Sequence, residues 1–402
     1  MEAKMLNIHE LESLPIYKDL LSEKSGKKTY NDYPQLLKSD IAKNFPNNFT
    51  CHKLENAFKS KQLEFTTTSG TTSDKMQIIR KKDWWKEEYN RVYSQVPILS
   101  EKKEFNKVIF TTAICSSSVC HIGKTTMKQR ISGNILYVNT KFDPFSFTPE
   151  DINRIIDEIN FFKPYYIEAD AVYLSIFLMY KKKYNISKSI HKPKIITLSY
   201  EFSNKNIKKY LKKYFNCPVL DFYGSTEFGY AFLENKDGNM KMCKGKLQVN
   251  LDPLNASKNL YVILISSEKN EFMPLFNYRS GDIAEVTQNQ LKNFDSDPEI
   301  SRIVGRERDI TFDKNNEIVT VANIDDFVST FDNIILYQLE FFEKEKIIFR
   351  YVTYDFSYLS DADKNKISNF IYNLYAIPVD ILYQICIPPE ISGKFSIIKK
   401  CC

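Results

Sequence analysis

The spacing of apolar residues predicts an alternation of helices and strands along most of the chain. Between residues 151 and 162, apolar side chains recur three and four positions apart after the start signal Thr148-Pro149-Glu150, which predicts a helix. Short continuous apolar runs predict buried strands. Such runs lie at 108–113, 194–198, 218–220 and 260–265. The alternation indicates an α/β fold with mixed or parallel sheets.

The pattern changes after residue 308. The remaining residues hold strand-like runs at 346–352 and 381–387, with a helical segment at 361–375 between them. That content is enough for a small α+β domain. We therefore predict a large domain over 1–308 and a small domain over 309–402.

Composition narrows the class of protein. The chain has 402 residues, of which 43% are hydrophobic, so it can build a packed core. Its 56 basic and 50 acidic residues give a net charge of +6, and the short lysine clusters fit solvated helix faces rather than a nucleic-acid surface. The longest apolar segment, 171–179, is interrupted by Ser175 and is too short to span a membrane. We expect a cytoplasmic protein, monomeric or homodimeric, without a signal peptide.

The eight cysteines are scattered, as expected of reduced thiols. Cys51-His52 and Cys120-His121, with Cys115, could form a zinc site only if folding brought them together. No C-x-x-C pair anchors such a site.

A run of hydroxyl side chains surrounds one glycine at residues 66–73, directly after an apolar segment. Glycine lets the backbone aim successive N–H groups at one point, and the hydroxyls add donors that a polyphosphate could use. The run lacks the G-x-x-x-x-G-K-[ST] spacing of the phosphate loop of kinases and GTPases. A polar surface loop between two strands is the alternative for the run alone.

Glycine is scarce, with 11 in the chain, and four more short polar segments contain one. An aromatic ring, hydroxyls and a carboxylate at 221–227 could stack a base, approach phosphate and hold magnesium. A carboxylate beyond the turn at 278–282 could bind a ribose diol. The other two segments are 305–309, with two arginines, and 388–395, which would present one lysine. Each segment alone also fits an ordinary turn.

In their order along the chain, these segments resemble the motifs of the class I adenylate-forming enzymes. This superfamily contains acyl-CoA synthetases, peptide-synthetase adenylation domains and luciferases. The stretch from Tyr33 to Asp40, together with Ser199-Tyr200-Glu201, is most similar to the phenylacetate–CoA ligase branch. The resemblance extends over nearly the whole chain. It implies the large and small domains predicted above.

The resemblance also implies the role of each site residue. The cofactors it implies are ATP and Mg²⁺, with coenzyme A as a further candidate. Lys394, Thr226 and Glu227 are the implied catalytic residues, and Glu227 is also the implied metal ligand. Asp309 is the implied hinge of the small domain. The implied ATP-binding residues are Thr68, Ser69, Gly70, Thr71, Thr72, Ser199, Tyr200, Glu201, Tyr223, Gly224, Ser225, Asp282 and Arg306.

The implied reaction has two steps. A carboxylic acid attacks the α-phosphate of ATP, giving an acyl adenylate and pyrophosphate, and a thiol such as coenzyme A then takes the acyl group. Positioning and stabilisation of charge supply most of the catalysis. We expect a small aromatic acid, bound near 111–118 and Tyr230 to Phe232. Three alternatives to the thiol ligase remain: transfer to a carrier protein, transfer to an amine in natural-product biosynthesis, or nucleotide binding without turnover.

Two departures from the family pattern stand out. Ser73-Asp74-Lys75 replaces the usual end of the phosphate loop, so an acid lies where phosphate is expected. The region 314–317 lacks the glycine that lines the thiol tunnel in the family. Asparagine is the best substitute for a left-handed residue, so we expect the turn to survive there.

Overall fold

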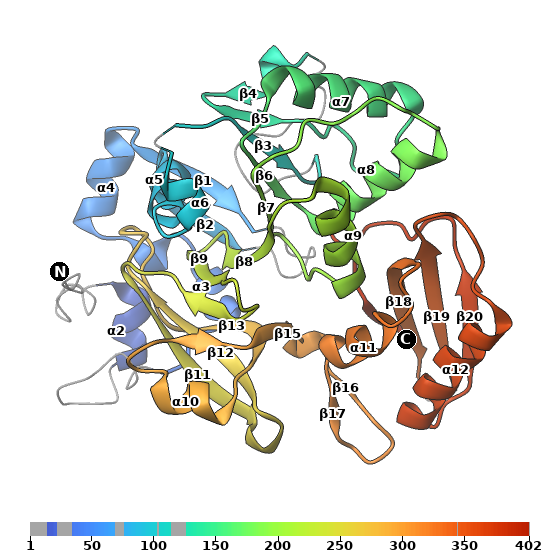
Figure 1. Cartoon of the computed structure of the whole chain (residues 1–402). Coiled ribbons are helices and arrows are strands. Elements are labelled where there is room, and N and C mark those ends of the chain that lie inside the picture. Colours follow the sequence, from blue (N-terminus) through green and yellow to red (C-terminus); the bar gives the residue numbers. More distant parts are fainter. Residues whose placement is uncertain are drawn as a thin grey trace. The chain divides into compact units, whose positions relative to one another are not determined.

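The computed structural model describes residues 14–21, 34–68, 76–102, 104–113, 126–343 and 345–401. Backbone contacts divide the chain into two compact units. The first unit contains Met1–Lys102, Ser116–Val119 and Phe222–Ile303, and the second contains Lys103–Cys115, Cys120–Asp221 and Val304–Cys402. The chain mixes helices with parallel and antiparallel sheets (Figure 1), which confirms the predicted α/β class.

The first unit is built mainly on antiparallel strands. Strands β1 and β2 form a hairpin-like pair, while β11, β12, β13 and β15 form a four-stranded sheet in that order. The second half of β8 pairs with β9, and β9 continues to β10 and β14. The strands are β1 (Leu63–Thr67), β2 (Gln77–Lys81), β8 (Val219–Ser225), β9 (Gly229–Glu234), β10 (Met240–Met242), β11 (Leu247–Asn255), β12 (Leu260–Ser267), β13 (Leu275–Glu285), β14 (Glu299–Ile300) and β15 (Arg302–Arg306). Two of them cross a unit boundary, because β8 up to Asp221 and β15 from Val304 belong to the second unit.

Six described α-helices belong to the first unit. They are α2 (Pro15–Leu21), α3 (Lys38–Lys43), α4 (His52–Lys59), α5 (Trp84–Tyr93), α6 (Pro97–Ser100) and α10 (Gln288–Asn293). The core of this unit gathers around β12, where all eight residues are buried. A continuous apolar run can form such a strand because both of its faces are covered. This confirms the strand predicted at 260–265.

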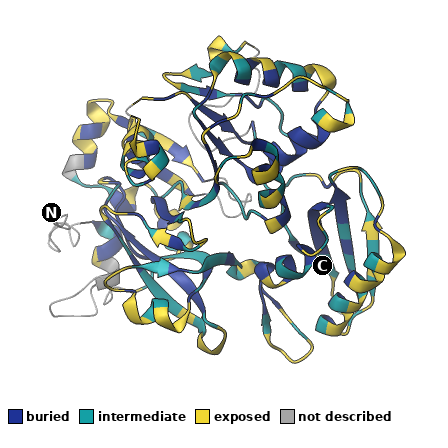
Figure 2. Ribbon diagram, viewed as in Figure 1, coloured by how far each residue is buried: buried dark blue, intermediate teal, exposed yellow. Residues whose placement is uncertain are grey.

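The second unit contains a mostly parallel sheet in the order β8-β7-β6-β3-β5-β4, with only β4 antiparallel to its neighbour. Strands β6 and β7 are buried throughout and are drawn dark in Figure 2. The connecting helices complete the βαβ units that a parallel sheet requires. These elements are β3 (Lys107–Phe110), β4 (Ile131–Ser132), β5 (Ile135–Tyr137), β6 (Tyr166–Ala169), β7 (Ile195–Leu198), α7 (Pro149–Phe162), α8 (Ala171–Lys183) and α9 (Lys205–Phe215).

The helix predicted at 151–162 is confirmed as α7, and its start has a physical cause. The Thr148 hydroxyl accepts from the Asp151 amide, and the Asp151 carboxylate accepts from the Thr148 amide. This capping box satisfies two backbone donors that the first turn leaves unpaired. Ile152, Ile155 and Ile159 face the core, as their spacing predicts.

The C-terminal part of the second unit carries its own four-stranded sheet, in the order β20-β19-β18-β21. The predicted helix at 361–375 is confirmed, whereas the strand predicted at 381–387 begins earlier and ends at Tyr383. The shift follows from pairing, because β20 joins β19 in parallel from Val379 and leaves the sheet after Tyr383. The elements are β16 (Thr311–Phe312), β17 (Ile318–Val319), α11 (Val321–Val328), β18 (Ile334–Phe342), β19 (Lys346–Thr353), α12 (Asp361–Tyr375), β20 (Val379–Tyr383) and β21 (Ile398–Cys401).

Hydrogen bonds join this C-terminal part to helix α9 within the same unit. The Asn204 side chain donates to the Ile335 carbonyl at 2.9 Å, and the Asn206 side chain donates to the Ile334 carbonyl at 2.9 Å. Both asparagines are buried, so these bonds replace contacts that water would otherwise make. The domain boundary at 308/309 stays a prediction.

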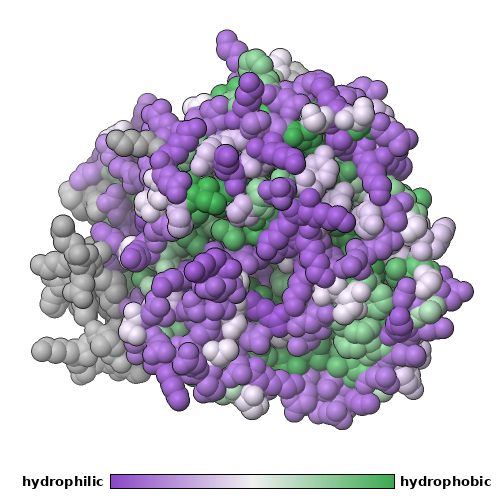
Figure 3. Space-filling view, viewed as in Figure 1, coloured by the Kyte–Doolittle hydropathy of each residue, from purple (hydrophilic) through white to green (hydrophobic). Residues whose placement is uncertain are grey.

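The surface drawn in Figure 3 is mainly hydrophilic, as expected of a chain with 26% charged residues. On this face, hydrophobic residues show in smaller patches. Within the described part of the chain, no helix has both the length and the apolar character needed to cross a bilayer.

Helix α7 allows a matched test of the core. Ile155 is fully buried, while Phe161 on the same helix is 74% exposed. We expect Ile155→Ala to lower the free energy of unfolding by about 2–5 kcal/mol because it leaves a cavity. Phe161→Ala should change it by less than about 0.5 kcal/mol. Urea unfolding of both variants measures the difference, and equal losses would contradict this packing.

Candidate functional site

The hydroxyl-rich run begins at the end of β1. Thr68 donates its amide to the Met76 carbonyl at 2.9 Å, and the Met76 amide donates to the Thr68 hydroxyl at 3.0 Å. These two bonds close the base of the segment that joins β1 to β2. The predicted residues Ser69, Gly70, Thr71 and Thr72 lie outside the described residues, as does Asp74. Their phosphate-binding role therefore stays a prediction.

The second motif forms the end of β8 and the turn into β9. A β-bulge lies between Tyr223 and Gly224, and a Cβ on Gly224 would come within 2.5 Å of the Gly229 carbonyl oxygen. Only glycine lets the two strands approach this closely. Thr226 and Glu227 follow at the turn, where both are partly exposed. The turn can therefore present a hydroxyl and a carboxylate to a ligand.

Side chains predicted from separate motifs meet in the first unit. The Tyr223 hydroxyl donates to Asp282 Oδ2 at 2.9 Å. Burial and the Asp282 charge raise the pKa of Tyr223 well above its usual value, so the phenol keeps its proton. The Asp282 amide donates to the Ser280 hydroxyl at 3.1 Å, across the turn at Gly281, where φ is +77°.

Tyr278 contacts the candidate site, although the sequence motifs assigned it no role. Its hydroxyl donates to Glu227 Oε1 at 3.2 Å, which orients that carboxylate. It begins the segment 278–282, but nothing in the sequence marks a buried strand tyrosine as a partner of a residue 51 positions away. Tyr223, Glu227 and Asp282 thus share one region of the first unit, with Tyr278 as a supporting residue.

Another predicted motif, Ser199-Tyr200-Glu201, follows β7 in the second unit. Tyr200 has φ of +85°, a backbone conformation that is uncommon for a residue with a side chain. Its hydroxyl donates to Glu168 Oε1 at 2.7 Å, and Glu168 forms a buried ion pair with Lys107 at 2.6 Å. Burial lowers the pKa of Lys107 and outweighs the attraction of Glu168. This network holds the motif in a strained conformation, as is common at functional sites.

The loop that carries Lys394 lies against this motif within the second unit. The Phe395 amide donates to Glu201 Oε2 at 2.7 Å. The Tyr173 hydroxyl lies 3.0 Å from the Gly393 carbonyl. Its one proton is shared between two acceptors, the carbonyls of Gly393 and Phe142. The Phe395 ring packs edge-on against the Tyr173 ring, with centroids 5.9 Å apart. The structure therefore brings together Glu201 and the Lys394 loop, which the sequence predicted separately.

Gly393 is required at this position for two reasons. Its φ is +78°, in the left-handed region, and a Cβ there would lie 2.4 Å from the Thr112 hydroxyl oxygen. A side chain would therefore push the loop off Thr112 or distort the turn. We refer to Thr112, Tyr173 and Glu201, which contact residues 393–395, as the loop seat.

Asp170 lies beside Glu201 and was not predicted from the sequence. It caps helix α8, where its Oδ1 accepts from the Val172 amide at 3.0 Å. Burial raises the pKa of Asp170 to about 6 and raises that of Glu201 well above its usual range, although the Lys394 charge opposes both shifts. Two adjacent buried carboxyls cannot both ionise easily, so the pair retains a proton near neutral pH.

Two buried polar atoms of the 199–201 motif lack a hydrogen-bond partner among the described residues. Among the described residues, no nitrogen or hydroxyl donor reaches Glu201 Oε1, which is buried. A hydrogen bond between the side chains of Glu201 and Asp170 requires a proton on one of the two carboxyls. The Ser199 hydroxyl is likewise buried without a partner in the described part of the chain. A buried hydroxyl without a partner is a candidate contact for a ligand atom.

Arg306 and Asp309 lie where the chain enters the C-terminal part of the second unit. Arg306 ends β15, and Asp309 closes a single 3-10 turn over Glu307–Asp309. The hinge role of Asp309 stays a prediction. Nearby, Asn316 has φ of +62°, which confirms that asparagine adopts the left-handed conformation in the 314–317 turn.

The carboxylate of Glu227 fits a magnesium ligand. Mg²⁺ in nucleotide sites is usually held by one or two carboxylates together with phosphate oxygens. Glu227, partly exposed at its turn, meets that need without further protein ligands. The described residues contain no cluster of three His, Cys, Asp or Glu side chains suited to a metal, so within them the scattered cysteines form no zinc site.

The predicted set is divided between the two units. The first unit holds Thr68, the 223–227 motif and Asp282, and the second holds the 199–201 motif, Arg306, Asp309 and Lys394. The acyl-binding residues expected near Tyr230 belong to the first unit, where Tyr230, Ala231 and Phe232 are buried in β9. Thr111 belongs to the second unit, and the residues from 114 to 118 lie outside the described part.

Comparisons with known proteins give a partial relative and several fold matches. No family model matches the chain. Protein CapK of Staphylococcus aureus is 24% identical over 222 residues, which cover 54% of this chain and 47% of that protein. The matched stretch therefore spans about half the length of this curated relative.

Solved structures extend the likeness to nearly the whole chain. A 2-hydroxyisobutyryl-CoA ligase with a bound acyl adenylate matches 97% of this chain and 86% of its own, with a TM-score of 0.70 and 12% identity. An anthranilate CoA ligase with anthranoyl-AMP matches 82% and 65%, with a TM-score of 0.57 and 11% identity. An o-succinylbenzoate CoA synthetase from Bacillus subtilis matches 82% and 67%, with a TM-score of 0.52 and 12% identity. The chain thus has the α/β fold of adenylate-forming acyl-CoA ligases.

Proposed function

We propose that the chain is an ATP-dependent, AMP-forming acid ligase. A carboxylate oxygen of the substrate attacks the α-phosphorus of ATP, the bond from that phosphorus to the bridging oxygen breaks, and pyrophosphate leaves. One observation carries the proposal: Glu201 and the Lys394 loop, assigned to one site by separate motifs, are joined by the hydrogen bond from Phe395 to Glu201. The fold shared with acyl-CoA ligases supports it.

In the proposed mechanism, the first unit binds magnesium, phosphate and nucleoside. Residues 68–72 and the Thr226 hydroxyl bind the leaving phosphates, and Glu227 holds magnesium, which neutralises phosphate charge when bound. Tyr223 stacks on adenine. Asp282 accepts from the ribose hydroxyls, and the hydrogen bond from Tyr223 fixes the orientation of that carboxylate.

The second unit supplies the cation for the transition state. Negative charge builds on the α-phosphoryl oxygens as the carboxylate attacks. The Lys394 ammonium stabilises that charge, and a preorganised donor of this kind is usually the largest single contribution to catalysis. The loop seat fixes where the ammonium can reach, and Arg306 binds the ribose.

We propose that a thiol completes the reaction. The thiol sulfur attacks the acyl carbon, AMP leaves, and the thiol proton passes to solvent. Coenzyme A is the proposed acceptor, in keeping with the fold matches, and the small domain turns about Asp309 between the two steps. The left-handed Asn316 preserves the turn that usually contains glycine, so its side chain is the remaining obstacle to the thiol.

We propose a small aromatic acid as the substrate. Tyr230 packs against the rings of Trp85, Tyr89 and Phe222, so the segment after the 223–227 motif is lined with aromatic groups. Aromatic side chains favour edge-to-face and offset contacts with a ring. We also propose the phenylacetate–CoA ligase branch, on the strength of the 199–201 motif directly after β7.

An assay of pyrophosphate release across a panel of small acids tests the function. We expect release that depends on one class of acid, with thioester formation when coenzyme A is added. Release without a thioester would favour a carrier protein or an amine as acceptor. ATP binding without release for any acid would contradict adenylation and indicate a nucleotide-binding homologue.

Lys394 provides the sharpest test of the mechanism. We expect Lys394→Ala to lower the adenylation rate by about 10²–10³-fold, because the cation acts on charge that develops in the transition state. ATP affinity, measured by calorimetry, should change little. Lys364→Ala, which removes a partly exposed lysine paired with Asp361 on α12, is the control. An unchanged rate in Lys394→Ala would refute the assignment.

Gly393 tests the loop seat itself. Gly393→Ala should lower the adenylation rate about tenfold or more, since the new methyl group collides with Thr112 and moves Lys394. Gly238→Ala is the matched control, because Gly238 has φ of +85° but a Cβ there would meet no atom within 4 Å. Both variants strain a left-handed residue, by roughly 1–2 kcal/mol. Equal rates in the two variants would show that the seat does not position Lys394.

A further inference from the structure

Three charged side chains contact one another next to the backbone that follows the 223–227 motif, two of them buried and one partly exposed. Glu88 and Arg91 lie one turn apart on α5, and Lys269 follows β12. The side chains of Glu88 and Lys269 are 3% and 6% exposed, and that of Arg91 is 20% exposed. Burying three charges costs several kcal/mol of hydration per ion unless each is well paired. We call Glu88, Arg91 and Lys269 the charged triad.

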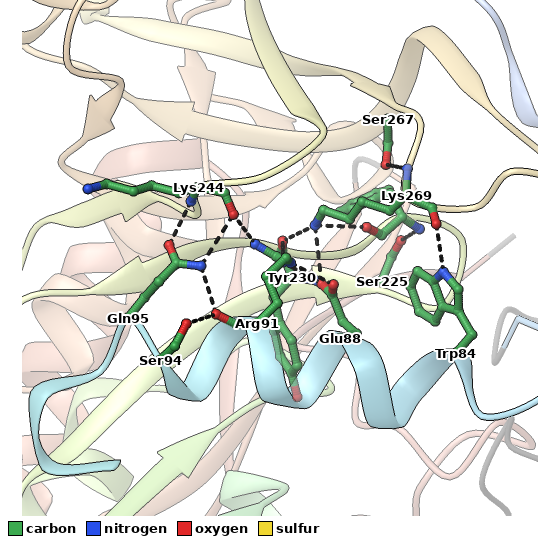
Figure 4. Close-up of polar contacts among 11 residues, drawn as sticks. Trp84, Glu88, Arg91, Ser94, Gln95, Ser225, Tyr230, Lys244, Ser267 and Lys269 are labelled. Atoms are coloured by element: carbon green, nitrogen blue, oxygen red, sulfur yellow. Dashed lines mark hydrogen bonds and ion pairs between the residues drawn. The ribbon is translucent and has the colours of Figure 1, made fainter. Parts of the chain in front are cut away.

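The charged triad binds the backbone immediately after the motif (Figure 4). Lys269 Nζ donates to the carbonyls of Phe228 and Tyr230, at 3.2 Å and 2.6 Å, and to Glu88 Oε1 at 3.1 Å. Its three protons are therefore all used. Arg91 donates to Glu88 Oε2 at 2.8 Å and to the Tyr230 carbonyl at 3.1 Å.

Glu88, the negatively charged member of the triad, binds the same backbone segment. Its Oε1 accepts from the Tyr230 amide at 2.7 Å. Gly229, between Phe228 and Tyr230, has φ of +74°. A Cβ on Gly229 would lie 2.3 Å from Glu88 Oε1. The carboxylate thus occupies the space of a missing side chain. The Phe228 carbonyl and both backbone polar groups of Tyr230 are bound by charged side chains.

We propose that the charged triad positions the turn that presents Thr226 and Glu227 to magnesium and phosphate. The inference rests on the proposed function. Glu227 is directly followed by Phe228, so the geometry of the bound backbone sets the direction of its carboxylate. Glu88, Arg91 and Lys269 are positioning residues, because they contact the turn rather than the reacting atoms.

The ionisation of the triad supports this role. Burial opposes charge on Glu88, but the Arg91 hydrogen bond and the charge of Lys269 outweigh it and lower its pKa. Burial lowers the pKa of Lys269 to about 8, with Arg91 repelling it and Glu88 attracting it. The neighbouring Cys243 thiol, whose pKa burial raises to about 11, stays protonated.

Because the pKa of Lys269 is lowered, its effect on the position of the turn can be distinguished from its effect on stability by changing the pH. Above about pH 8 the folded protein loses this proton, so the turn loses its ammonium and activity should fall. An unfolded lysine keeps its proton to about pH 10.4, so the unfolded state binds more protons in between. Stability therefore rises with pH across this range as far as Lys269 contributes. Activity and stability should move in opposite directions.

The variants Glu88→Gln and Lys269→Met test the inference. We expect each to lower kcat for adenylation by about tenfold or more, because a misplaced catalytic group is costly even at small displacements. KM for the acid should change little. The alkaline fall in activity near pH 8 should be absent in Lys269→Met. Thermal unfolding of the near-isosteric Glu88→Gln shows whether a loss of activity comes from unfolding alone.

A matched control uses another buried ion pair. Glu158 pairs with Arg130 in the second unit, where Arg130 also donates to the Tyr137 carbonyl at the end of β5. Glu158→Gln should cost stability but leave kcat per folded molecule unchanged. A drop in kcat equal to that of Glu88→Gln would overturn the inference.

One readout needs no turnover. Mg²⁺-dependent binding of ATP, measured by calorimetry, depends on the position of Glu227 but not on the chemical step. Weaker Mg²⁺-dependent binding in Lys269→Met than in Glu158→Gln supports the inference whether or not the wild type releases pyrophosphate. Equal binding and equal kcat in these two variants overturn it. Absence of pyrophosphate release in a wild type that binds Mg·ATP overturns the proposed function alone.

Discussion

A glycine turn held by a buried carboxylate is the interaction on which the candidate site depends, and the chain uses it twice. Glu88 accepts from the amide after Gly229, and Glu201 accepts from the amide two residues after Gly393. In both turns a side chain fills the space beside the glycine, which is Glu88 itself at Gly229 and Thr112 at Gly393. The backbone of each turn is thereby held beside its glycine, and this sets the position of the neighbouring candidate residues Glu227 and Lys394.

The two carboxylates differ in the charges around them. Glu88 lies between two cations and is ionised, so its hydrogen bonds are charge-assisted and strong. Glu201 lies beside a second acid, Asp170, and the pair retains a proton. Its bond to Phe395 is therefore the weaker of the two. The turn beside Glu227 is built to stay in place, whereas the loop with Lys394 is held by contacts that can be exchanged.

Sequence reasoning predicted the local elements and the motif order, because both depend on residues close together in the chain. Helix α7 follows from its apolar spacing and its capping box, and β12 follows from an unbroken apolar run. The strand predicted at 381–387 was wrong at both ends because its extent depends on pairing with β19, which the strand's own sequence does not encode. The motif residues Tyr223 and Asp282 could be predicted as neighbours only through the resemblance, since 59 positions separate them.

The supporting residues could not be predicted for a related reason. Glu88 and Arg91, three positions apart on an amphipathic helix, are indistinguishable in sequence from an ordinary surface ion pair. Their role emerges only when folding brings Tyr230, 142 positions away, against them. Asp170 is similar, because its position before an apolar helix predicts a cap and conceals its contact with Glu201. Residues that act through the backbone of another segment leave no local pattern.

The strength of the loop seat bears on how one site could serve two half-reactions. Two hydrogen bonds hold the loop, from Phe395 to Glu201 and from Tyr173 to Gly393, each worth about 0.5–1.5 kcal/mol. The edge-on contacts of Phe395 with Tyr173 and Phe145 add about 0.5–1.5 kcal/mol each. The total is roughly 2–6 kcal/mol, and its upper end reaches the ~5.5 kcal/mol that moves a two-state equilibrium from 99:1 to 1:99. In the proposed reaction, contacts of this strength would hold Lys394 during adenylation and still release it before a thiol enters.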